Sequence, residues 1–532
     1  MNVGTPSSIV KVCVACGRDV AAMQRHKDAD GHYYCHPCHE RLVTSAGGDA
    51  QLRYNCNVCG GRFPADGVYD DKGRIVCVGC WNQKQSPPPA QTQAPAASRP
   101  VKQLLHRVTC PHCWHAFLPG NILWVSRHAE LLGDPVLGSD AAARFLPTRI
   151  NLAGEAIDAR GMPCQLLACP RCHLIVPRAL TLTEPLFVSI IGVPASGKSY
   201  YLTAMTWELR RLLPSQFGIV FQDADTMTNR SLNEYEETLF LQADANRLVA
   251  IRKTELQGEL YDQIRLGQQV MSLPRPFLFT LRPTGRHPMA SAAETAGRVM
   301  CLYDNAGEHF QPGMDTVGAP VTQHLAKSRA LMFLYDPTQD PRFRHRCTDF
   351  SHDPQLNQSV RTHRQETVLI EAAARIRQYT GLSPDKKYER PLVVIVAKSD
   401  VWAPLLDVDI TSEPIMPLAV SAGGLSGLDV RRVEDVSHRV RRLLQQLTPE
   451  FVAAAEDFSK HVVYIPCSAL GGPPEVQEGT GMLGIRAKDI RPRWVAVPLL
   501  YMYAKWATGL IGIAQPKSNG AKPQPAPVVG TH

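Results

Sequence analysis

The sequence predicts an α/β fold with a mostly parallel, three-layer sheet, preceded by small cysteine modules. Two observations support this prediction. Short apolar runs rich in β-branched and aromatic residues alternate with helical patterns between residues 184 and 513, an order typical of a parallel sheet covered on both faces. Six CxxC pairs lie within the first 172 residues, a pattern typical of small metal-bound modules.

Length and composition indicate a globular chain of more than one domain. The chain has 532 residues, of which 44% are hydrophobic and 20% charged, so it can bury a sizeable core. The net charge of +8 is spread along the chain and gives little support for nucleic-acid binding. The N-terminus lacks a signal-peptide pattern. Pro498 and Lys505 interrupt the apolar stretch 494–514, so we expect a packed helix there, no membrane span, and a cytoplasmic protein.

The cysteines predict three zinc sites. The first four CxxC pairs form a tandem repeat, in which CVACGRDV…DGHYYCHPC is echoed by CNVCGGRF…KGRIVCVGC. Their pairs are separated by 18 and 17 residues, within the range of zinc ribbons, where two thiolate pairs complete a tetrahedral Zn²⁺ site. The third module has 55 residues between its pairs but can still close, because loop entropy grows slowly with length. The predicted Zn²⁺ ligands are Cys13, Cys16, Cys35, Cys38, Cys56, Cys59, Cys77, Cys80, Cys110, Cys113, Cys169 and Cys172.

These patterns divide the chain into five segments. We expect tandem zinc ribbons over 10–84, a Pro/Ala-rich linker over 85–104, the third ribbon with its insertion over 105–180, a nucleotide domain over 184–513 and a disordered tail over 515–532. The neighbouring histidines are interpreted as surface or supporting residues, because four thiolates already complete each site. Zinc ribbons bind proteins or nucleic acids, and their weak net charge here favours a protein partner.

The segment GVPASGKS follows the apolar strand LFVSII and precedes a helix, which is the arrangement of a phosphate-binding loop. Glycines let the backbone turn tightly and point its N–H groups at an anion, and the helix N-terminus adds partial positive charge. Lys198 is expected to reach the β- and γ-phosphates, and the Ser199 hydroxyl to bind Mg²⁺. The predicted contacts are Gly192, Pro194, Ala195, Ser196, Gly197, Lys198, Ser199 and Tyr200.

Three further motifs follow, each at a predicted strand end, where ligands bind in open α/β sheets. In VMCLYDNAGE, Asp304 can hold Mg²⁺ through water and the Gly307 N–H can bond the γ-phosphate. In VVIVAKSD, Asp400 can accept two hydrogen bonds from guanine while the Lys398 stem lies over the base. In PCSALG, the backbone around Ser468 and Ala469 would meet the guanine O6.

With GVPASGKS, DNAGE, AKSD and SAL in this order, residues 184–510 resemble the translation-factor-related class of P-loop GTPases. The order of ribbons, linker and GTPase domain is similar to the bacterial double-GTPase family. These resemblances imply a P-loop NTPase sheet, GTP and Mg²⁺ as ligands, and a regulatory switch in a multi-component signalling or conflict system. They also imply protein partners, among them a second GTPase.

The chain departs from the pattern of that class at two places. Ala397 stands where an Asn is expected, which removes one base-positioning contact. Glu308 and His309 stand where a Gln orients the attacking water, so either residue or neither orients it, and we expect slow hydrolysis that depends on a partner. No switch-I threonine is assigned, and a long helix is expected over Asn233–Arg265.

Two alternatives remain open. Glu308 in place of Gln also suits a non-catalytic nucleotide-sensing scaffold. The ribbons also suit a nucleic-acid-dependent ATPase, whose affinity for the strand would fall steeply with salt.

Overall fold

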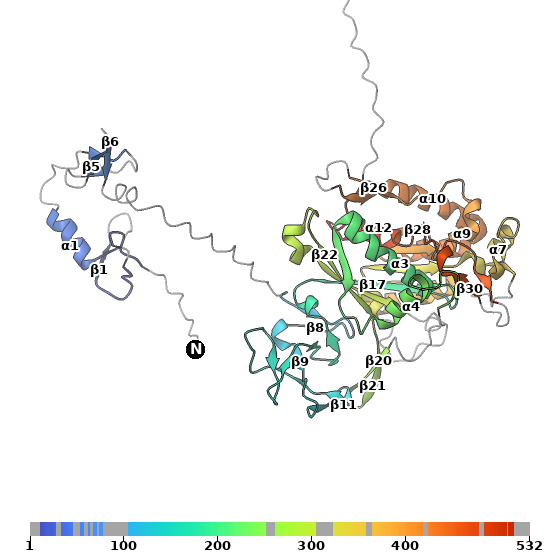
Figure 1. Ribbon diagram of the computed structural model, residues 1–532, viewed down its shortest axis with the longest axis horizontal. Helices are drawn as coiled ribbons and strands as arrows, with labels where there is room; N and C mark the ends of the chain where they lie inside the picture. The colour runs from blue at the N-terminus through green and yellow to red at the C-terminus, as the bar shows by residue number, and fades with distance from the viewer. Residues whose placement is uncertain are drawn as a thin grey trace, which may run out of the picture. The chain divides into compact units, whose positions relative to one another are not determined.

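In the computed structural model the chain separates into two compact units, Met1–Val101 and Lys102–His532 (Figure 1). The described residues are 11–16, 18–27, 33–45, 54–57, 62–63, 68–71, 74–77, 105–251, 261–304, 323–357, 364–418, 424–477, 483–507 and 509–514. The predicted linker 85–104 and the predicted tail 515–532 lie outside these residues.

The described part of the N-terminal unit contains small hairpins and one helix. Cys13, Val20 and Cys35 form one small core, and Cys56, Val76 and Cys77 form another. The elements of this unit are β1 (Arg25–Lys27), β2 (Tyr33–Cys35), α1 (His36–Ser45), β3 (Tyr54–Asn55), β4 (Arg62–Phe63), β5 (Val68–Asp71) and β6 (Arg74–Cys77), with β1–β2, β3–β4 and β5–β6 paired antiparallel.

A seven-stranded sheet forms the centre of the second unit, in the order β18-β22-β23-β17-β24-β25-β28. β22 alone runs opposite to the other six strands, so the predicted mostly parallel sheet is confirmed. β17 lies between β23 and β24. The chain builds the sheet outward from β17 first on one side and then on the other, and where the strand order reverses in this way a crevice opens at the carboxyl ends of the strands. The strands are β17 (Pro185–Gly192), β18 (Ile219–Asp223), β22 (Phe277–Pro283), β23 (Arg298–Asp304), β24 (Ala330–Tyr335), β25 (Leu392–Val396) and β28 (Val462–Pro466).

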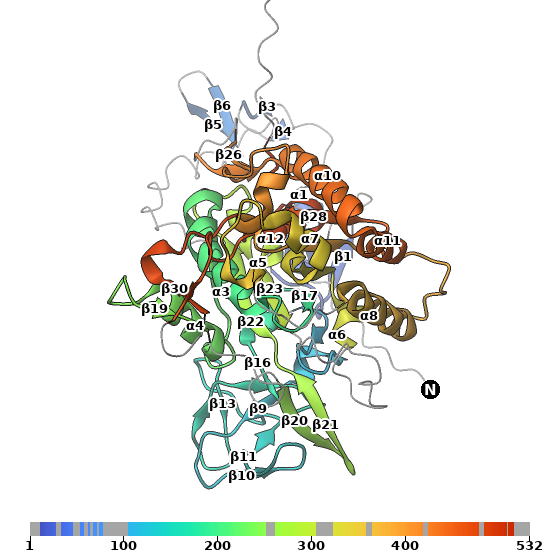
Figure 2. The ribbon, with the colours of Figure 1, turned by 90° about the vertical axis from the view of Figure 1, so that its right-hand side faces the viewer.

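Both faces of this sheet are covered, which explains why β24 and β25 are buried at every position. Tyr503 of α12 contacts Met300 of β23, whereas His324 of α6 stacks on Tyr303 of the same strand. Residues three apart in a strand point to opposite faces, and Figure 2 shows α3 and α12 on one side of β17 and α6 and α8 on the other. The helices are α3 (Lys198–Leu212), α4 (Arg230–Phe240), α5 (Ala293–Ala296), α6 (Gln323–Lys327), α7 (Pro341–Cys347), α8 (Gln365–Thr380), α9 (Ser399–Trp402), α10 (Val430–Leu447), α11 (Pro449–Phe458) and α12 (Val497–Trp506).

The third cysteine module, residues 105–180, belongs to the same compact unit as the sheet. Its insertion is folded into short strands, four of which form a sheet in the order β12-β9-β15-β16. Its elements are β7 (Val108–Thr109), β8 (Ala116–Phe117), β9 (Leu123–Val125), β10 (Leu132–Asp134), β11 (Gly138–Ala142), β12 (Arg144–Phe145), β13 (Ala156–Ile157), β14 (Pro163–Cys164), β15 (Leu167–Ala168) and β16 (Ile175–Val176).

The helix predicted over Asn233–Arg265 is wrong. α4 ends at Phe240, and the segment from Tyr261 forms a hairpin of β20 (Tyr261–Leu266) and β21 (Gln269–Pro274). Ile264 and Leu273 of this hairpin are buried in one hydrophobic cluster with the third cysteine module, and both figures show the hairpin beside β11. The hairpin therefore depends on a distant partner that the local pattern does not reveal.

The remaining strands form small sheets around the main one. β19 (Leu248–Val249) and β29 (Glu475–Val476) flank β30 (Leu483–Arg486), and β26 (Ile415–Pro417) pairs with β27 (Ser426–Leu428). The predicted helix within 494–514 is present as α12, and its residues Val497–Ala504 are all buried. Among the described residues, we find no helix with the length and apolarity needed to cross a membrane.

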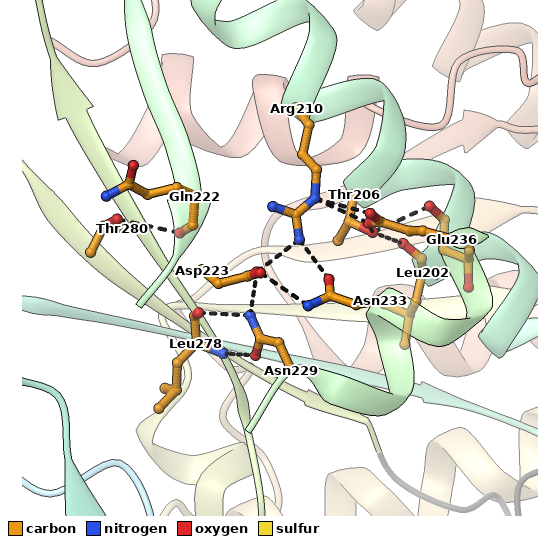
Figure 3. Close-up of polar contacts among 11 residues, drawn as sticks. Leu202, Thr206, Arg210, Gln222, Asp223, Asn229, Asn233, Glu236, Leu278 and Thr280 are labelled. Atoms are coloured by element: carbon orange, nitrogen blue, oxygen red, sulfur yellow. Dashed lines mark hydrogen bonds and ion pairs between the residues drawn. The ribbon is translucent and has the colours of Figure 1, made fainter. Parts of the chain in front are cut away.

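A buried polar network fixes α3 to its neighbours (Figure 3). The Arg210 guanidinium on α3 donates to Glu236 of α4 at 3.0 Å, to Asp223 of β18 at 2.7 Å and to Asn233 of α4 at 2.9 Å. Asn229 donates to Asp223 at 2.7 Å and exchanges two hydrogen bonds with the Leu278 backbone of β22. The helix that begins with Lys198 is therefore anchored at its far end.

Candidate functional site

The phosphate loop has the backbone that the sequence predicts. β17 ends at Gly192 and α3 begins at Lys198, and both Ala195 and Gly197 have positive φ, of 59° and 91°. A Cβ on Gly192 would lie 2.9 Å from the Leu334 carbonyl oxygen, so only glycine fits there. Successive N–H groups in such a loop form a concave anion site, and the α3 N-terminus adds its positive end.

Asp304 ends β23 and pairs in register with Ile190 of β17, beside the loop. Its side chain is buried, and burial raises the pKa of its carboxyl group while the Lys198 charge lowers it. Among the described residues its Oδ1 has no hydrogen-bond partner. A buried carboxylate oxygen without a partner, influenced by the charge of the lysine that precedes Ser199, fits the oxygen ligands that Mg²⁺ requires. The predicted Gly307, Glu308 and His309 lie outside the described residues.

A cavity of about 160 Å³ joins the phosphate loop to the two predicted base-reading segments. Tyr200 lines the cavity, and its hydroxyl accepts a hydrogen bond from the Ile251 N–H at 3.0 Å. Leu470, Leu483 and Ile485 supply apolar walls. The predicted residues that line this cavity are Ala195, Ser196, Gly197, Tyr200, Lys398, Asp400, Ser468 and Ala469.

Asp400 and Ser468 meet in this cavity although they are 68 residues apart. The Ser468 hydroxyl donates to the Asp400 carboxylate, and Ser468 also accepts the Gly471 N–H at 2.8 Å. Burial raises the pKa of Asp400, and the Ser468 hydrogen bond and the Lys398 and Arg493 charges lower it. The two segments are thus held together before any ligand arrives.

Lys398 is placed by residues that the sequence analysis did not assign to the site. It has a positive φ of 54°, and its ammonium lies 2.7 Å from Asp336 Oδ2, 3.0 Å from Thr338 Oγ1 and 2.8 Å from Gln355 Oε1. Asp336 directly follows the last residue of β24, and Asp304 is the last residue of β23. An acid at a strand end is a sequence pattern that could have revealed it.

Two other residues of the segment after β24 also reach the site. The Gln339 amide donates to the Pro194 carbonyl of the phosphate loop at 3.3 Å. Asp353 lines the cavity, and its burial raises the pKa of its carboxyl group. The loop from β24 therefore supports both the phosphate side and the base side.

Two of the predicted cysteine sets converge. The sulfurs of Cys13, Cys16, Cys35 and Cys38 lie within 4.8 Å of one another, and so do those of Cys110, Cys113, Cys169 and Cys172. The Cys110–Cys172 and Cys113–Cys169 sulfurs are 3.6 and 3.7 Å apart, close to the roughly 3.8 Å expected between thiolates around tetrahedral Zn²⁺. Both sets therefore fit a structural zinc ion.

The second ribbon is described only in part. The Cys77 N–H donates to the Cys56 sulfur at 3.2 Å, and Cys59 and Cys80 lie outside the described residues. The histidines of the third module bond elsewhere, as expected, since His173 Nδ1 lies 2.7 Å from Asp134 Oδ2 and His112 Nε2 lies 3.0 Å from the Ile175 carbonyl oxygen.

Comparison with known proteins gives one relative over most of the chain. No protein-family model matches. The chain is 25% identical over 435 residues to the "Putative ESX-1 scaffolding and assembly protein SaeC" of Mycolicibacterium smegmatis. The aligned region covers 76% of this chain and 99% of that protein.

Solved structures with low similarity to this chain include Era and the Ski7 GTPase-like domain. Era from Aquifex aeolicus, bound to GDP and AlF4⁻, is 13% identical with a TM-score of 0.20 and covers 55% of this chain. The Saccharomyces cerevisiae Ski7 GTPase-like domain bound to GTP is 12% identical with a TM-score of 0.20 and covers 54%. The chain spans 53% and 44% of those chains, about half of each. Such low TM-scores support no structural conclusion.

Proposed function

We propose that this chain is a GTP-binding and hydrolysing regulatory switch that carries zinc ribbons for protein docking. One observation carries the proposal: a single cavity is lined by the phosphate loop, by Lys398 and Asp400, and by Ser468 and Ala469. A loop for phosphates and a buried carboxylate at the far side match the two ends of a nucleotide.

Each residue has a distinct task in this proposal. Lys198 and the loop N–H groups hold the β- and γ-phosphates, and the fixed α3 N-terminus keeps them in line. Ser199 and Asp304 would hold Mg²⁺, which when bound neutralises the charge of the phosphate oxygens. Gly307 would bond the γ-phosphate, and Glu308 or His309 would orient water. Without a Gln there, we expect slow hydrolysis.

Asp400 would select guanine. Its carboxylate is acceptor-only, and guanine offers N1–H and N2–H₂ donors where adenine offers none in that arrangement. The Ser468 hydroxyl donates to one oxygen of this carboxylate and so helps to orient it. A ligand without those donors would leave the buried carboxylate with the Ser468 hydroxyl as its side-chain hydrogen-bond donor and no donor from the base, so guanine should be preferred.

Calorimetry on the zinc-loaded full chain with GDP, a non-hydrolysable GTP analogue and an ATP analogue tests this proposal. Guanine nucleotides should bind and the ATP analogue should bind at least tenfold more weakly, on the order of one good hydrogen bond to a charged group. Lys198→Ala should abolish binding. Lys460→Ala, which removes an exposed lysine paired with Glu389, is the matched control. Equal affinity for ATP and GTP analogues would refute the guanine assignment.

Asp400→Asn sharpens the same test. An amide replaces one acceptor by a donor, which suits the O2 carbonyl of xanthine and opposes the N2 amine of guanine. Affinity should therefore move from GDP toward xanthosine diphosphate. A loss of affinity for both nucleotides would show that Asp400 supports the fold and does not read the base.

A nucleotide-sensing scaffold is the second candidate, and the likeness to SaeC along nearly the whole of that protein favours it. By that likeness we propose a role in assembling a multi-protein complex, with the ribbons as docking modules for protein partners, a second GTPase among them. Steady-state phosphate release that is lost in Asp304→Ala would support the enzyme. Nucleotide binding without any release would support the scaffold.

A further inference from the structure

The third cysteine module is bonded directly to the strand that carries Asp304. The Tyr303 hydroxyl accepts a hydrogen bond from Trp114 Nε1 at 3.1 Å and donates one to the Pro111 carbonyl oxygen. Pro111 lies between Cys110 and Cys113, and Trp114 follows Cys113, so both partners of Tyr303 belong to one zinc-binding turn. Tyr303 is fully buried, and it immediately precedes Asp304.

The same ring contacts the helix that follows the predicted γ-phosphate sensor. His324 of α6 stacks on Tyr303 with ring centroids 4.6 Å apart, and its Nδ1 lies 2.6 Å from the Ser189 hydroxyl of β17. The Trp114 ring lies 6.3 Å from the His324 ring. Trp114, Tyr303 and His324 therefore form one buried cluster on the face of the sheet opposite α12.

Trp114 shares an unusual backbone conformation with His173, the residue at the same place after the second CxxC pair of the module. The φ of Trp114 is 54°, in the left-handed region, which is unfavourable for a large side chain. In both tandem ribbons the residue after the second cysteine of the first pair is glycine, Gly17 and Gly60, the residue that this conformation favours. A tryptophan at this place gives up that advantage and gains the contact with Tyr303.

A second attachment joins the module to the β20–β21 hairpin, which leads into β22, the strand next to β23. The Arg265 N–H of β20 donates to the Val136 carbonyl oxygen of the module at 2.8 Å. β21 leads into β22, which pairs with β23 from Phe277↔Leu302 to Leu281↔Arg298. The module thus holds β23 directly through Tyr303 and indirectly through its neighbouring strand.

We infer that the third zinc module is a working part of the nucleotide site, in which Trp114 and Tyr303 are positioning residues for Asp304. The inference rests on the proposed function for the identity of the ligand. Zinc at Cys110, Cys113, Cys169 and Cys172 fixes the turn, the turn fixes Tyr303, and Tyr303 fixes the end of β23. Because coupling between two binding sites is reciprocal, Mg²⁺–nucleotide binding must in turn stabilise zinc at this site.

Tyr303→Phe in the zinc-loaded full chain tests this role, because it removes the hydroxyl and keeps the ring. Tyr464→Phe is the matched control. Tyr464 lies in β28 of the same sheet, and the substitution removes a tyrosine hydroxyl that donates to Glu456 of α11. The first readout is the GDP dissociation constant in magnesium-containing and magnesium-free buffer. The second readout is the rate of zinc release to a chromophoric chelator, measured with and without Mg²⁺–GDP. The kinetic phase of zinc release that is absent in Cys113→Ser is assigned to the third site.

In wild type, Mg²⁺ should strengthen GDP binding and Mg²⁺–GDP should slow zinc release from the third site. Tyr303→Phe should reduce the magnesium-dependent gain by at least about fivefold, leave the magnesium-free affinity unchanged and remove the effect of nucleotide on zinc release. Trp114→Phe should act in the same direction. A loss of thermal stability alone would not produce this selective change.

Two outcomes would overturn the inference. One is a Tyr303→Phe protein that keeps both the magnesium-dependent gain and the nucleotide effect on zinc release. The other is an equal loss in Tyr464→Phe, which would reveal a general weakening of the sheet. Failure of the wild type to bind any nucleotide would instead refute the proposed function, so the two failures are distinguishable.

Discussion

The ion pair between Lys398 and Asp336 gives a quantitative test of how the base side of the cavity is built. The Asp336 side chain is completely buried, and the Lys398 ammonium lies 2.7 Å from it. Lys398→Met keeps most of the stem and removes the charge, which leaves a buried carboxylate without its cation. Such a loss costs roughly 3–5 kcal/mol of unfolding free energy. Lys398 is 20% exposed, so water compensates in part and we expect about 3 kcal/mol.

Thermal unfolding of the zinc-loaded, nucleotide-free protein measures this cost. For a unit of this size 1 kcal/mol corresponds to about 2 °C, so the unfolding temperature of the second unit should fall by about 6 °C. Lys398→Met combined with Asp336→Asn should recover most of the loss, because the amide oxygen can still accept from the Thr338 N–H and hydroxyl. The double-mutant cycle isolates the pair from other contacts.

The result that would refute this reasoning is a double variant no more stable than Lys398→Met alone. An unchanged unfolding temperature in Lys398→Met with lost GDP affinity would be equally decisive, because Lys398 would then serve the ligand and not the fold. The AKSD motif predicts that the Lys398 stem lies over the base, and in the structure the Lys398 charge is already paired with Asp336.

Two further predictions concern the two ends of the cavity. Gly192→Ala places a Cβ 2.9 Å from the Leu334 carbonyl oxygen, so it should displace the loop, cost about 1–3 kcal/mol of stability and weaken GDP binding at least tenfold, as calorimetry can show. Gly120→Ala, whose Cβ would have nothing within 4 Å and which does not line the cavity, should do neither. Because burial raises the pKa of Asp400, its carboxylate takes up a proton at a higher pH than a free aspartate. GDP affinity should therefore fall as the pH is lowered through that raised pKa, and Asp400→Asn should lack this step. A GDP affinity that is flat down to the ordinary aspartate pKa would contradict it.

The phosphate loop could be predicted because everything it needs is contiguous. A buried strand, two glycines and a helix start lie within one short segment, and the positive φ of Gly197 follows from local sterics. The cavity as a whole could be predicted only in outline. Asp400 and Ser468 were assigned from motifs at two strand ends, and parallel strands bring their ends to one edge.

The hairpin Tyr261–Pro274 could not be predicted because its stability comes from distant residues. Locally, Tyr261 to Leu266 carries polar and apolar residues that suit a helix as well as a strand. Ile264 is buried in a cluster formed with distant residues of the cysteine module, β22 and β23. Gln339 and Gln355 were missed for a similar reason. A glutamine in a loop has no distinctive pattern, and its role appears only when the fold brings it to Pro194 or Lys398.

The six CxxC pairs look alike in the sequence, but the third module differs in what its surface can do. Its first zinc-binding turn is buried against Tyr303, and Cys110, Trp114 and Phe117 share a hydrophobic cluster with β23. A surface that is already covered by its own chain cannot dock another protein without first separating from the sheet, at the cost of that buried area. This turn is therefore unavailable for docking, whereas Leu146, Ile150 and Leu152 of the same module are exposed. We propose that docking uses the tandem modules at 10–84 or this exposed part of the insertion, while the covered turn serves the nucleotide domain.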